Sequence, residues 1–213
     1  MTAVSIDAVI FDCDGTLVDS ETLSLSVLID YVSEFGLEIT PEEAHDRFAG
    51  NELSVVFRDI ESRLGHALPD HFLDTFRQRQ ISLLERQLTA IDGAHDLLDG
   101  MDLPFCVASN APFSKIHVCL RTTGLDVHFS EDRIFSAYQI EVWKPAPDLF
   151  LKAARDMGVA PERCAVVEDS GFGIRAGLAA GMQVFAFDPD NRHTEYSGIR
   201  RVTHLNQLAA CFR

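Results

Sequence analysis

The 213-residue sequence is poor in positive charge. Its 18 lysine and arginine residues stand against 33 aspartates and glutamates, a formal net charge of −15. A surface this negative repels the phosphate backbone of nucleic acids, so we exclude nucleic acid as a partner. The same charge repels small anions, so any site for a phosphorylated ligand needs local cations or a metal ion.

Long hydrophobic runs are also missing. No apolar stretch reaches the length that spans a bilayer, and the N-terminal MTAVSIDAVIF has no basic region before its apolar residues. We therefore expect no signal peptide, no membrane partner and a cytoplasmic monomer. The five cysteines form no CxxC pair, which favours buried, reduced thiols, and the eight histidines lack the spacing of a zinc site.

What the sequence does contain is a set of short, continuously apolar runs. They are AVIFD (8–12), FCVASN (105–110), CAVVEDS (164–170) and MQVFAF (182–187). Continuous apolarity suits strands that are buried on both faces of a parallel sheet. Helical segments lie between the runs, and one of them is expected to begin after Pro147 and to end at Gly158. This alternation predicts a doubly wound, parallel α/β fold.

Residues 18–89 break that rhythm, because they have a helical pattern throughout. Thr40 is expected to cap a helix that has Pro41 in its first turn and Glu43 completing a capping box. In residues 70–88, apolar side chains recur at the spacing of an amphipathic helix. We predict a core domain of residues 1–17 and 90–213, with a helical domain of residues 18–89 inserted in it.

Polar residues follow three of the predicted strands, and one lysine lies in a loop between them. They are Asp12 and Asp14 after the first strand, Ser109 and Asn110 after the second, Glu168 and Asp169 after the third, and Lys144 in the loop. Ligands of open α/β sheets bind beyond the carboxyl ends of the strands. Four acids and a lysine at that edge favour phosphoryl transfer assisted by Mg²⁺.

The first of these groups carries the reacting residues. A carboxylate can attack phosphorus and form an aspartyl-phosphate, and Asp12 is the candidate nucleophile. Asp14, two positions on, can protonate the leaving oxygen and later accept a proton from water. A calcium loop needs its glycine at the sixth position, whereas Gly15 stands fourth from Asp12. A solvated turn would explain the Asp-Gly pair but not the apolar residues before it.

The remaining residues are assigned to metal and phosphate. Magnesium prefers oxygen ligands, and we expect Asp12, Asp169, the Asp14 carbonyl and Glu168 to supply them. The phosphate contacts are expected from Lys144, Ser109, Asn110, Gly15 and Thr16. Taken singly, each has an ordinary alternative: a turn at 109–110, acids that complement a helix N-terminus at 168–169, and a surface lysine at 144.

Together, these motifs resemble those of the haloacid dehalogenase superfamily of aspartate-nucleophile phosphotransferases. The resemblance rests on DCDGT (12–16), SN (109–110), KPAPD (144–148) and EDS (168–170), and it extends over nearly the whole chain. It implies a three-layer, Rossmann-like core, a bound Mg²⁺, and a helical cap whose residues set specificity. An aspartate at position 14 disfavours dehalogenation, because the true dehalogenases lack it.

Within the superfamily, two groups look similar. β-Phosphoglucomutases share the first motif and the cap, but they carry a histidine and an arginine where this chain has Ser24 and Leu53. The segments FSAYQIEVWKPAPDLF and FCVASNAP look closest to bacterial sugar-phosphate phosphatases, including a group that hydrolyses 6-phosphogluconate. The differences from the mutases at Ser24 and Leu53 favour hydrolysis over phosphate transfer between sugar positions.

We therefore expect a Mg²⁺-dependent phosphatase that acts on a small phosphorylated sugar or sugar acid. A sugar phosphomutase is the alternative on the same core, and a non-catalytic phosphate- or protein-binding module is the alternative of another class. The loop RFAGNELSVV (47–56) is expected to set specificity, with Asn51 contacting the substrate. A plain helix–helix turn around Gly50 is the other interpretation of that loop.

Overall fold

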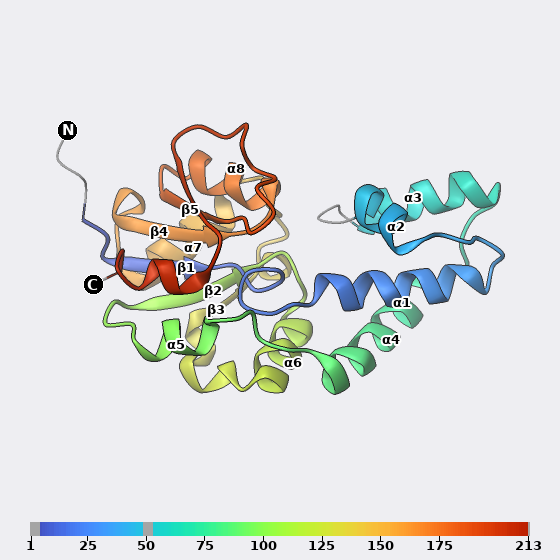
Figure 1. Ribbon diagram of the computed structural model, residues 1–213, viewed down its shortest axis with the longest axis horizontal. Helices are drawn as coiled ribbons and strands as arrows, with labels where there is room; N and C mark the ends of the chain where they lie inside the picture. Colours follow the sequence, from blue (N-terminus) through green and yellow to red (C-terminus); the bar gives the residue numbers. More distant parts are fainter. Residues whose placement is uncertain (1–4, 49–52, 213) are drawn as a thin grey trace. The chain divides into compact units, whose positions relative to one another are not determined.

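The computed structural model describes residues 5–48 and 53–212, and the chain divides into two compact units (Figure 1). One unit comprises the residues up to Asp19 together with those from Thr89 onward, and the other is Ser20–Leu88. The segments that leave and re-enter the first unit pair with each other. The Asp19 N–H donates to the Thr89 carbonyl at 3.0 Å, and Val18 forms an antiparallel bridge with Ala90.

The first unit is built on six parallel strands in the order β3-β2-β1-β4-β5-β6. They are β1 (Ala8–Phe11), β2 (Phe105–Ser109), β3 (Ile134–Ser136), β4 (Cys164–Glu168), β5 (Gln183–Phe187) and β6 (Ile199–Val202). The predicted doubly wound α/β fold is confirmed. The two strands that the apolar runs did not indicate, β3 and β6, are the edges of the sheet. β3 has only three residues, and most of β6 is not buried.

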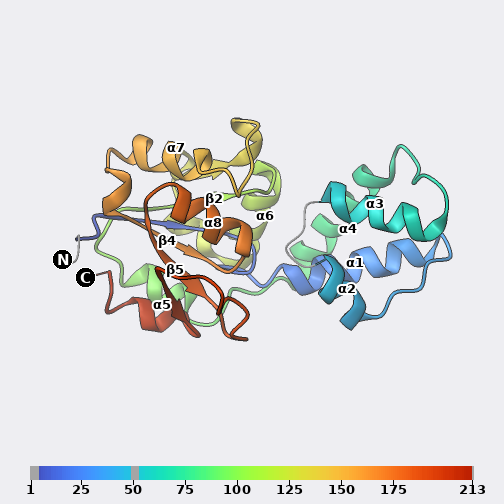
Figure 2. The same ribbon diagram turned by 90° about the horizontal axis from the view of Figure 1, so that it is seen from above.

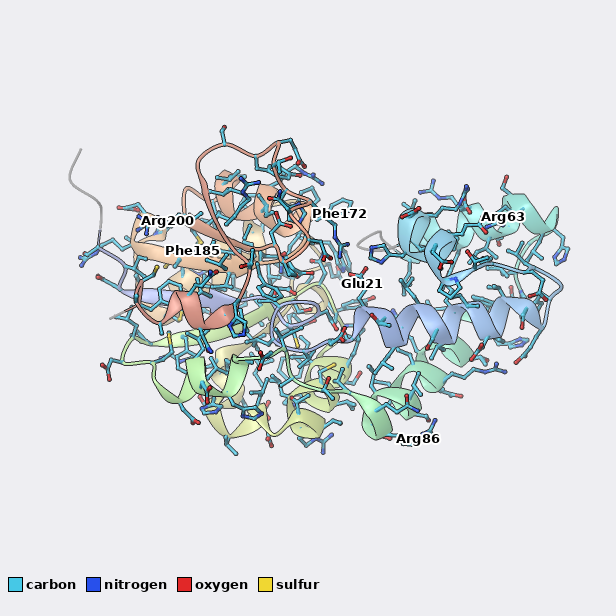
Figure 3. All side chains as sticks on the ribbon, in the orientation of Figure 1. Glu21, Arg63, Arg86, Phe172, Phe185 and Arg200 are labelled. Carbon is cyan, nitrogen blue, oxygen red and sulfur yellow. The ribbon has the colours of Figure 1, made fainter. Side chains whose placement is uncertain are left out.

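Helices cover both faces of this sheet (Figure 2). On one face, Ile10 and Val166 belong to a core cluster with Phe150 of α7 (Asp148–Met157) and Ala176 of α8 (Gly171–Ala179). On the other face, the Phe185 ring lies 5.0 Å from that of Phe212, centroid to centroid. Figure 3 labels Phe185 and Arg200, whose guanidinium carbon lies 5.3 Å from the centre of the Phe185 ring.

The other helices of this unit lie between strands along the chain, except η5, which follows β6. They are α5 (Ala94–Asp99), α6 (Phe113–Thr123), and the 3-10 turns η1 (Leu125–His128), η2 (Glu131–Arg133), η3 (Ala137–Gln139), η4 (Pro161–Arg163) and η5 (Leu205–Leu208). The predicted limits of α7 are confirmed, because the helix begins at Asp148 and Gly158 closes it with a left-handed φ of 72°. A glycine adopts that conformation without steric cost.

The described residues of the second unit form four helices and no strand. The helices are α1 (Glu21–Ser33), α2 (Pro41–Phe48), α3 (Leu53–Leu64) and α4 (Phe72–Gln87). An aromatic core holds them together: the Tyr31 and Phe72 rings stack 4.4 Å apart, and Phe57 meets Phe72 edge-on. The amphipathic spacing predicted for residues 70–88 is confirmed, since Phe72, Phe76 and Leu84 are all buried.

The start of α2 follows its predicted chemistry in part. The Glu43 N–H donates to the Thr40 hydroxyl at 3.2 Å, which confirms the cap. The Glu43 carboxylate pairs with Arg63 of α3 at 3.0 Å. A full positive charge is a stronger partner for a carboxylate than a backbone amide is. A partner 20 residues away cannot be predicted from the residues next to Glu43.

In the described part of the chain, no helix is both long and apolar enough to cross a bilayer.

Candidate active site

The carboxyl ends of β1 and β4 form the centre of the site. These two strands are neighbours at the point where the strand order reverses, which is where open α/β sheets bind ligands. Asp12 continues β1, because its N–H donates to the Val167 carbonyl at 2.9 Å. Its side chain is buried, with only 9% exposure. A carboxylate so enclosed needs a cationic partner, and a loop beside the sheet supplies it.

Lys144 is the partner that Asp12 and Glu168 share. Its Nζ lies 2.5 Å from Asp12 Oδ1 and 2.7 Å from Glu168 Oε1, and its side chain is 2% exposed. The Phe150 ring centre lies 4.7 Å from the same ammonium. The sequence placed these three residues at one edge of the sheet, and the structure brings them into direct contact. The ordinary alternative of a surface lysine is wrong for Lys144.

Burial and charge shift the ionisation of this group. Burial raises the pKa of Asp12 to about 8; the charge of Lys144 opposes the rise, while those of Glu168 and Asp14 add to it. The pKa of Lys144 is held above its usual range, since the attraction of Asp12 and Glu168 outweighs the effect of burial. Both pKa shifts arise because two carboxylates share one ammonium in a site with little solvent.

Both carboxylate oxygens of Glu168 accept hydrogen bonds from protein donors. Oε1 accepts from Lys144, and Oε2 accepts from the Ser170 N–H at 2.8 Å and the Ser170 hydroxyl at 2.9 Å. The side chain also lies against Gly173, where an added Cβ would meet Oε1 at 1.7 Å. These contacts hold Lys144 in place, and the predicted role of Glu168 as a metal ligand stays a prediction.

Asp14 has a partner that the sequence analysis missed. Lys115, in the first turn of α6, donates to Asp14 Oδ1 at 2.6 Å, and the Ser109 hydroxyl lies 3.5 Å from Asp14 Oδ2. The side chains of Asp14 and Lys115 are 26% and 15% exposed. The sequence did contain a signal for this contact. A helix that follows a parallel strand starts at the carboxyl edge of the sheet, so a lysine in its first turn lies near the site.

Ser109 and Asn110 also stabilise the loops around them. The Ser109 hydroxyl accepts from the Ala111 N–H at 3.0 Å, as a turn residue does. Asn110 Oδ1 accepts from the Lys144 N–H at 2.9 Å, and its Nδ2 donates to the Lys144 carbonyl at 3.4 Å. Asn110 therefore ties the Lys144 loop to the end of β2. Its predicted contact with phosphate stays a prediction.

Gly15, Thr16 and His193 surround Asp169. A Cβ on Gly15, whose φ is +80°, would lie 2.1 Å from Asp169 Oδ2, so only glycine fits there. The Thr16 hydroxyl, fully buried, donates to Asp169 Oδ1 at 2.9 Å. His193 Nε2 lies 2.5 Å from the Asp169 carbonyl, which can only accept, so the ring N–H is the donor. The backbone of His193 is in turn bound to the buried Asp188.

Comparison with known proteins identifies the family. Residues 9–187 match the family model described as haloacid dehalogenase-like hydrolase. The chain belongs to this family. It is 38% identical over 206 residues to 6-phosphogluconate phosphatase of Escherichia coli K12, a match that covers 95% of this chain and 93% of the relative. The resemblance seen in the sequence is confirmed.

Solved structures agree with this assignment. A haloacid dehalogenase-like protein from Agrobacterium tumefaciens superposes with a TM-score of 0.85 at 33% identity over 97% of both chains. A family hydrolase from Deinococcus radiodurans, solved with bound phosphate and sodium, gives 0.79 at 31% identity over 98% of both. The chain is thus a phosphatase of the haloacid dehalogenase type, and the non-catalytic alternative is not supported.

The charges in this haloacid dehalogenase-type site fit a divalent cation. The site contains four acidic side chains, those of Asp12, Asp14, Glu168 and Asp169, and two ammonium groups, those of Lys144 and Lys115. A bound cation favours the ionised form of Asp12, and with all four acids ionised the excess of two negative charges matches Mg²⁺, as do the oxygen donors of Asp12 and Asp169. Among residues 5–48 and 53–212, no three or more His, Cys, Asp or Glu side chains form a metal cluster. Magnesium commonly takes only one or two carboxylates, so two fit it.

The predicted specificity loop is described only at its ends. Asn51 lies outside the described residues, as does Gly50. Arg47, at the end of α2, pairs with Asp59 of α3 at 2.5 Å. Ser24 lies inside the helical unit, where its hydroxyl donates to the Ser20 carbonyl at 2.7 Å and accepts from Gln80 at 2.8 Å.

Proposed function

We propose that this protein is a Mg²⁺-dependent phosphatase that hydrolyses a small phosphorylated sugar or sugar acid, with 6-phosphogluconate as the first candidate. The observation that carries the proposal is the buried contact of Asp12 with Lys144, itself held by Glu168. A buried carboxylate at the switch point, beside a fixed cation, is suited to attack an anionic phosphate.

In the first step, a carboxylate oxygen of Asp12 forms a bond to phosphorus, and the bond from phosphorus to the sugar oxygen breaks. The leaving oxygen takes a proton from Asp14 and departs as the alcohol. Lys144 offsets the negative charge that the phosphoryl group brings next to Asp12. The products of this step are the free sugar and an aspartyl-phosphate on Asp12.

In the second step, a water oxygen attacks the same phosphorus and passes a proton to Asp14. The bond between phosphorus and Asp12 breaks, so that the carboxylate and inorganic phosphate are regenerated. Asp14 ends in the protonation state in which it began. The sum of both steps is the hydrolysis of a phosphate monoester by one water molecule.

The residues that would hold Mg²⁺ are Asp12, Asp169 and the carbonyl of Asp14. When bound, the ion screens the repulsion between an anionic nucleophile and an anionic phosphate. Thr16, through its hydroxyl bond to Asp169, orients one of these ligands. Glu168, predicted earlier as a fourth ligand, also accepts a hydrogen bond from Lys144.

The comparison and the helical unit support the proposed substrate class. The similarity to 6-phosphogluconate phosphatase covers 95% of this chain, so it includes most of Ser20–Leu88 as well as the α/β unit. A second relative, hexitol phosphatase A of Escherichia coli K12, is 29% identical over 181 residues. We infer that Ser20–Leu88 is the cap that selects the substrate, with Asn51 among its contacts.

The test is phosphate release from a panel of sugar phosphates and sugar-acid phosphates, with Mg²⁺ and with EDTA. We expect the highest kcat/KM for a phosphorylated sugar or sugar acid, and loss of activity with EDTA. Asp12→Asn keeps the shape of the side chain but removes the nucleophile, and it should abolish turnover while circular dichroism stays unchanged. Retained turnover in Asp12→Asn would contradict the mechanism. Isomerised sugar phosphate in place of free phosphate would support the mutase instead.

A further inference from the structure

The contact between Lys115 and Asp14 has no place in the mechanism above. It joins residues 101 positions apart, from the first turn of α6 and the loop after β1. Their atoms lie 2.6 Å apart, and most of both side chains is shielded from solvent. Enclosing a lysine costs free energy, and the nearby charge of Asp14 offsets that cost. Such a pair differs from a surface pair such as Lys152 and Asp156, four positions apart on one helix.

The contact restricts the position of the Asp14 carboxylate. An aspartate side chain can occupy three staggered rotamers, and a hydrogen bond to one oxygen favours one of them. Here the ammonium of Lys115 binds Oδ1, and the Ser109 hydroxyl lies 3.5 Å from Oδ2. Both partners come from residues 109–115, at the end of β2 and the start of α6. The segment after β2 thus orients a residue that belongs to the segment after β1.

We propose that Lys115 is a positioning residue for Asp14, acting through the orientation of its carboxylate. The inference rests on the proposed function, in which Asp14 delivers a proton to the leaving oxygen. A displacement of about 1 Å at such a group can lower the rate by about 100-fold. Lys144, by contrast, is engaged with Asp12 and Glu168, so the two lysines serve different carboxylates.

Substrates with different leaving groups distinguish a positioning role of Lys115 from a general loss of activity. A sugar alkoxide is a poor leaving group and needs a proton, whereas p-nitrophenolate is a good one and departs without it. The ratio kcat/KM covers the steps up to transfer of phosphorus to Asp12, so it reports on the step in which the leaving group departs. Loss of Asp14 orientation should therefore lower kcat/KM for a sugar phosphate much more than for p-nitrophenyl phosphate.

The variant is Lys115→Met, which keeps the apolar stem and removes the ammonium. With Mg²⁺, we expect kcat/KM for the best sugar phosphate of the panel to fall by about 100-fold, and that for p-nitrophenyl phosphate by less than about 3-fold. Lys115→Arg should recover part of the loss, because it restores a charged donor. Lys152→Met, which removes the exposed pair on α7, should change neither value.

An equal loss on both substrates, or no loss on either, would overturn the inference. Thermal unfolding followed by circular dichroism checks that the variants fold. If Lys115→Met does not fold, Lys115→Gln, whose neutral amide is a weaker donor, takes its place; kcat/KM for the sugar phosphate should then fall by less than with Met, and still by more than that for p-nitrophenyl phosphate. A wild-type protein that releases phosphate from no substrate refutes the proposed function itself. Wild-type activity with an unselective Lys115 variant refutes only the role of Lys115.

Discussion

The ammonium of Lys144 lies 2.5 Å from the carboxylate of Asp12, although 132 positions separate the two residues in the chain. Asp12 follows β1, and Lys144 lies in the loop between β3 and α7. Glu168, the last residue of β4, holds the other side of the same ammonium at 2.7 Å. Three separate segments therefore meet in one buried contact, and the consequences of breaking it can be measured.

Replacement of Lys144 by alanine should reduce both stability and activity. It would leave the carboxylates of Asp12 and Glu168 buried without their shared cation, a change that typically costs about 3–5 kcal/mol of unfolding free energy. Urea denaturation gives this value directly. Lys152→Ala is the matched control: its pair with Asp156 is exposed, and it should cost less than about 0.5 kcal/mol. Equal effects of the two substitutions would contradict the buried role of Lys144.

Gly15→Ala should disturb Asp169 without unfolding the protein. The new Cβ would lie 2.1 Å from Asp169 Oδ2, in addition to the strain of a φ of +80°. We expect Mg²⁺-dependent activity to fall by at least about 100-fold. Gly158→Ala separates the two effects, because Gly158 has a φ of +72° and nothing within 4 Å of an added Cβ. That control should lose about 1 kcal/mol of stability and keep its activity. An active Gly15→Ala protein would refute the close approach of Asp169.

His193→Ala should weaken metal binding. The ring N–H of His193 donates to the carbonyl of Asp169, and removal of such an outer contact typically costs about 10–100-fold in metal affinity. Titration with Mn²⁺, followed by electron paramagnetic resonance, measures this affinity without turnover. His193→Gln should recover part of it, since its amide can donate to the same carbonyl. His204→Ala, which loses a contact with the exposed Asp92, should bind Mn²⁺ like the wild type.

The native protein should expose few reactive thiols. Cys13, Cys106, Cys119 and Cys164 are buried, and Cys211 is the one partly exposed cysteine among the described residues. Burial raises the pKa of Cys164 to about 11, so its thiolate is scarce at pH 8. We expect Ellman's reagent to react at once with one thiol, at Cys211, and with all five after unfolding in guanidinium. Rapid reaction of two or more native thiols would contradict the buried positions.

Local chemistry predicted most of the elements and their order. The apolar runs marked β1, β2, β4 and β5, because strands buried on both faces must be apolar throughout. The edge strands β3 and β6 escaped notice, since a short or partly exposed strand need not carry that signature. The helical run of residues 18–89 and the polar strand ends were likewise visible in the sequence, because periodicity and turn chemistry act over a few residues.

By itself, the sequence determined the fold class, the family resemblance and the set of polar residues at one edge of the sheet. Only the tertiary structure decided how those residues are paired. It assigned Lys144 to Asp12 and Glu168, Asn110 to the Lys144 backbone, and Lys115 to Asp14. These contacts depend on strand order and loop path, which bring distant segments within 3 Å. No pattern read over a few neighbouring residues carries that information.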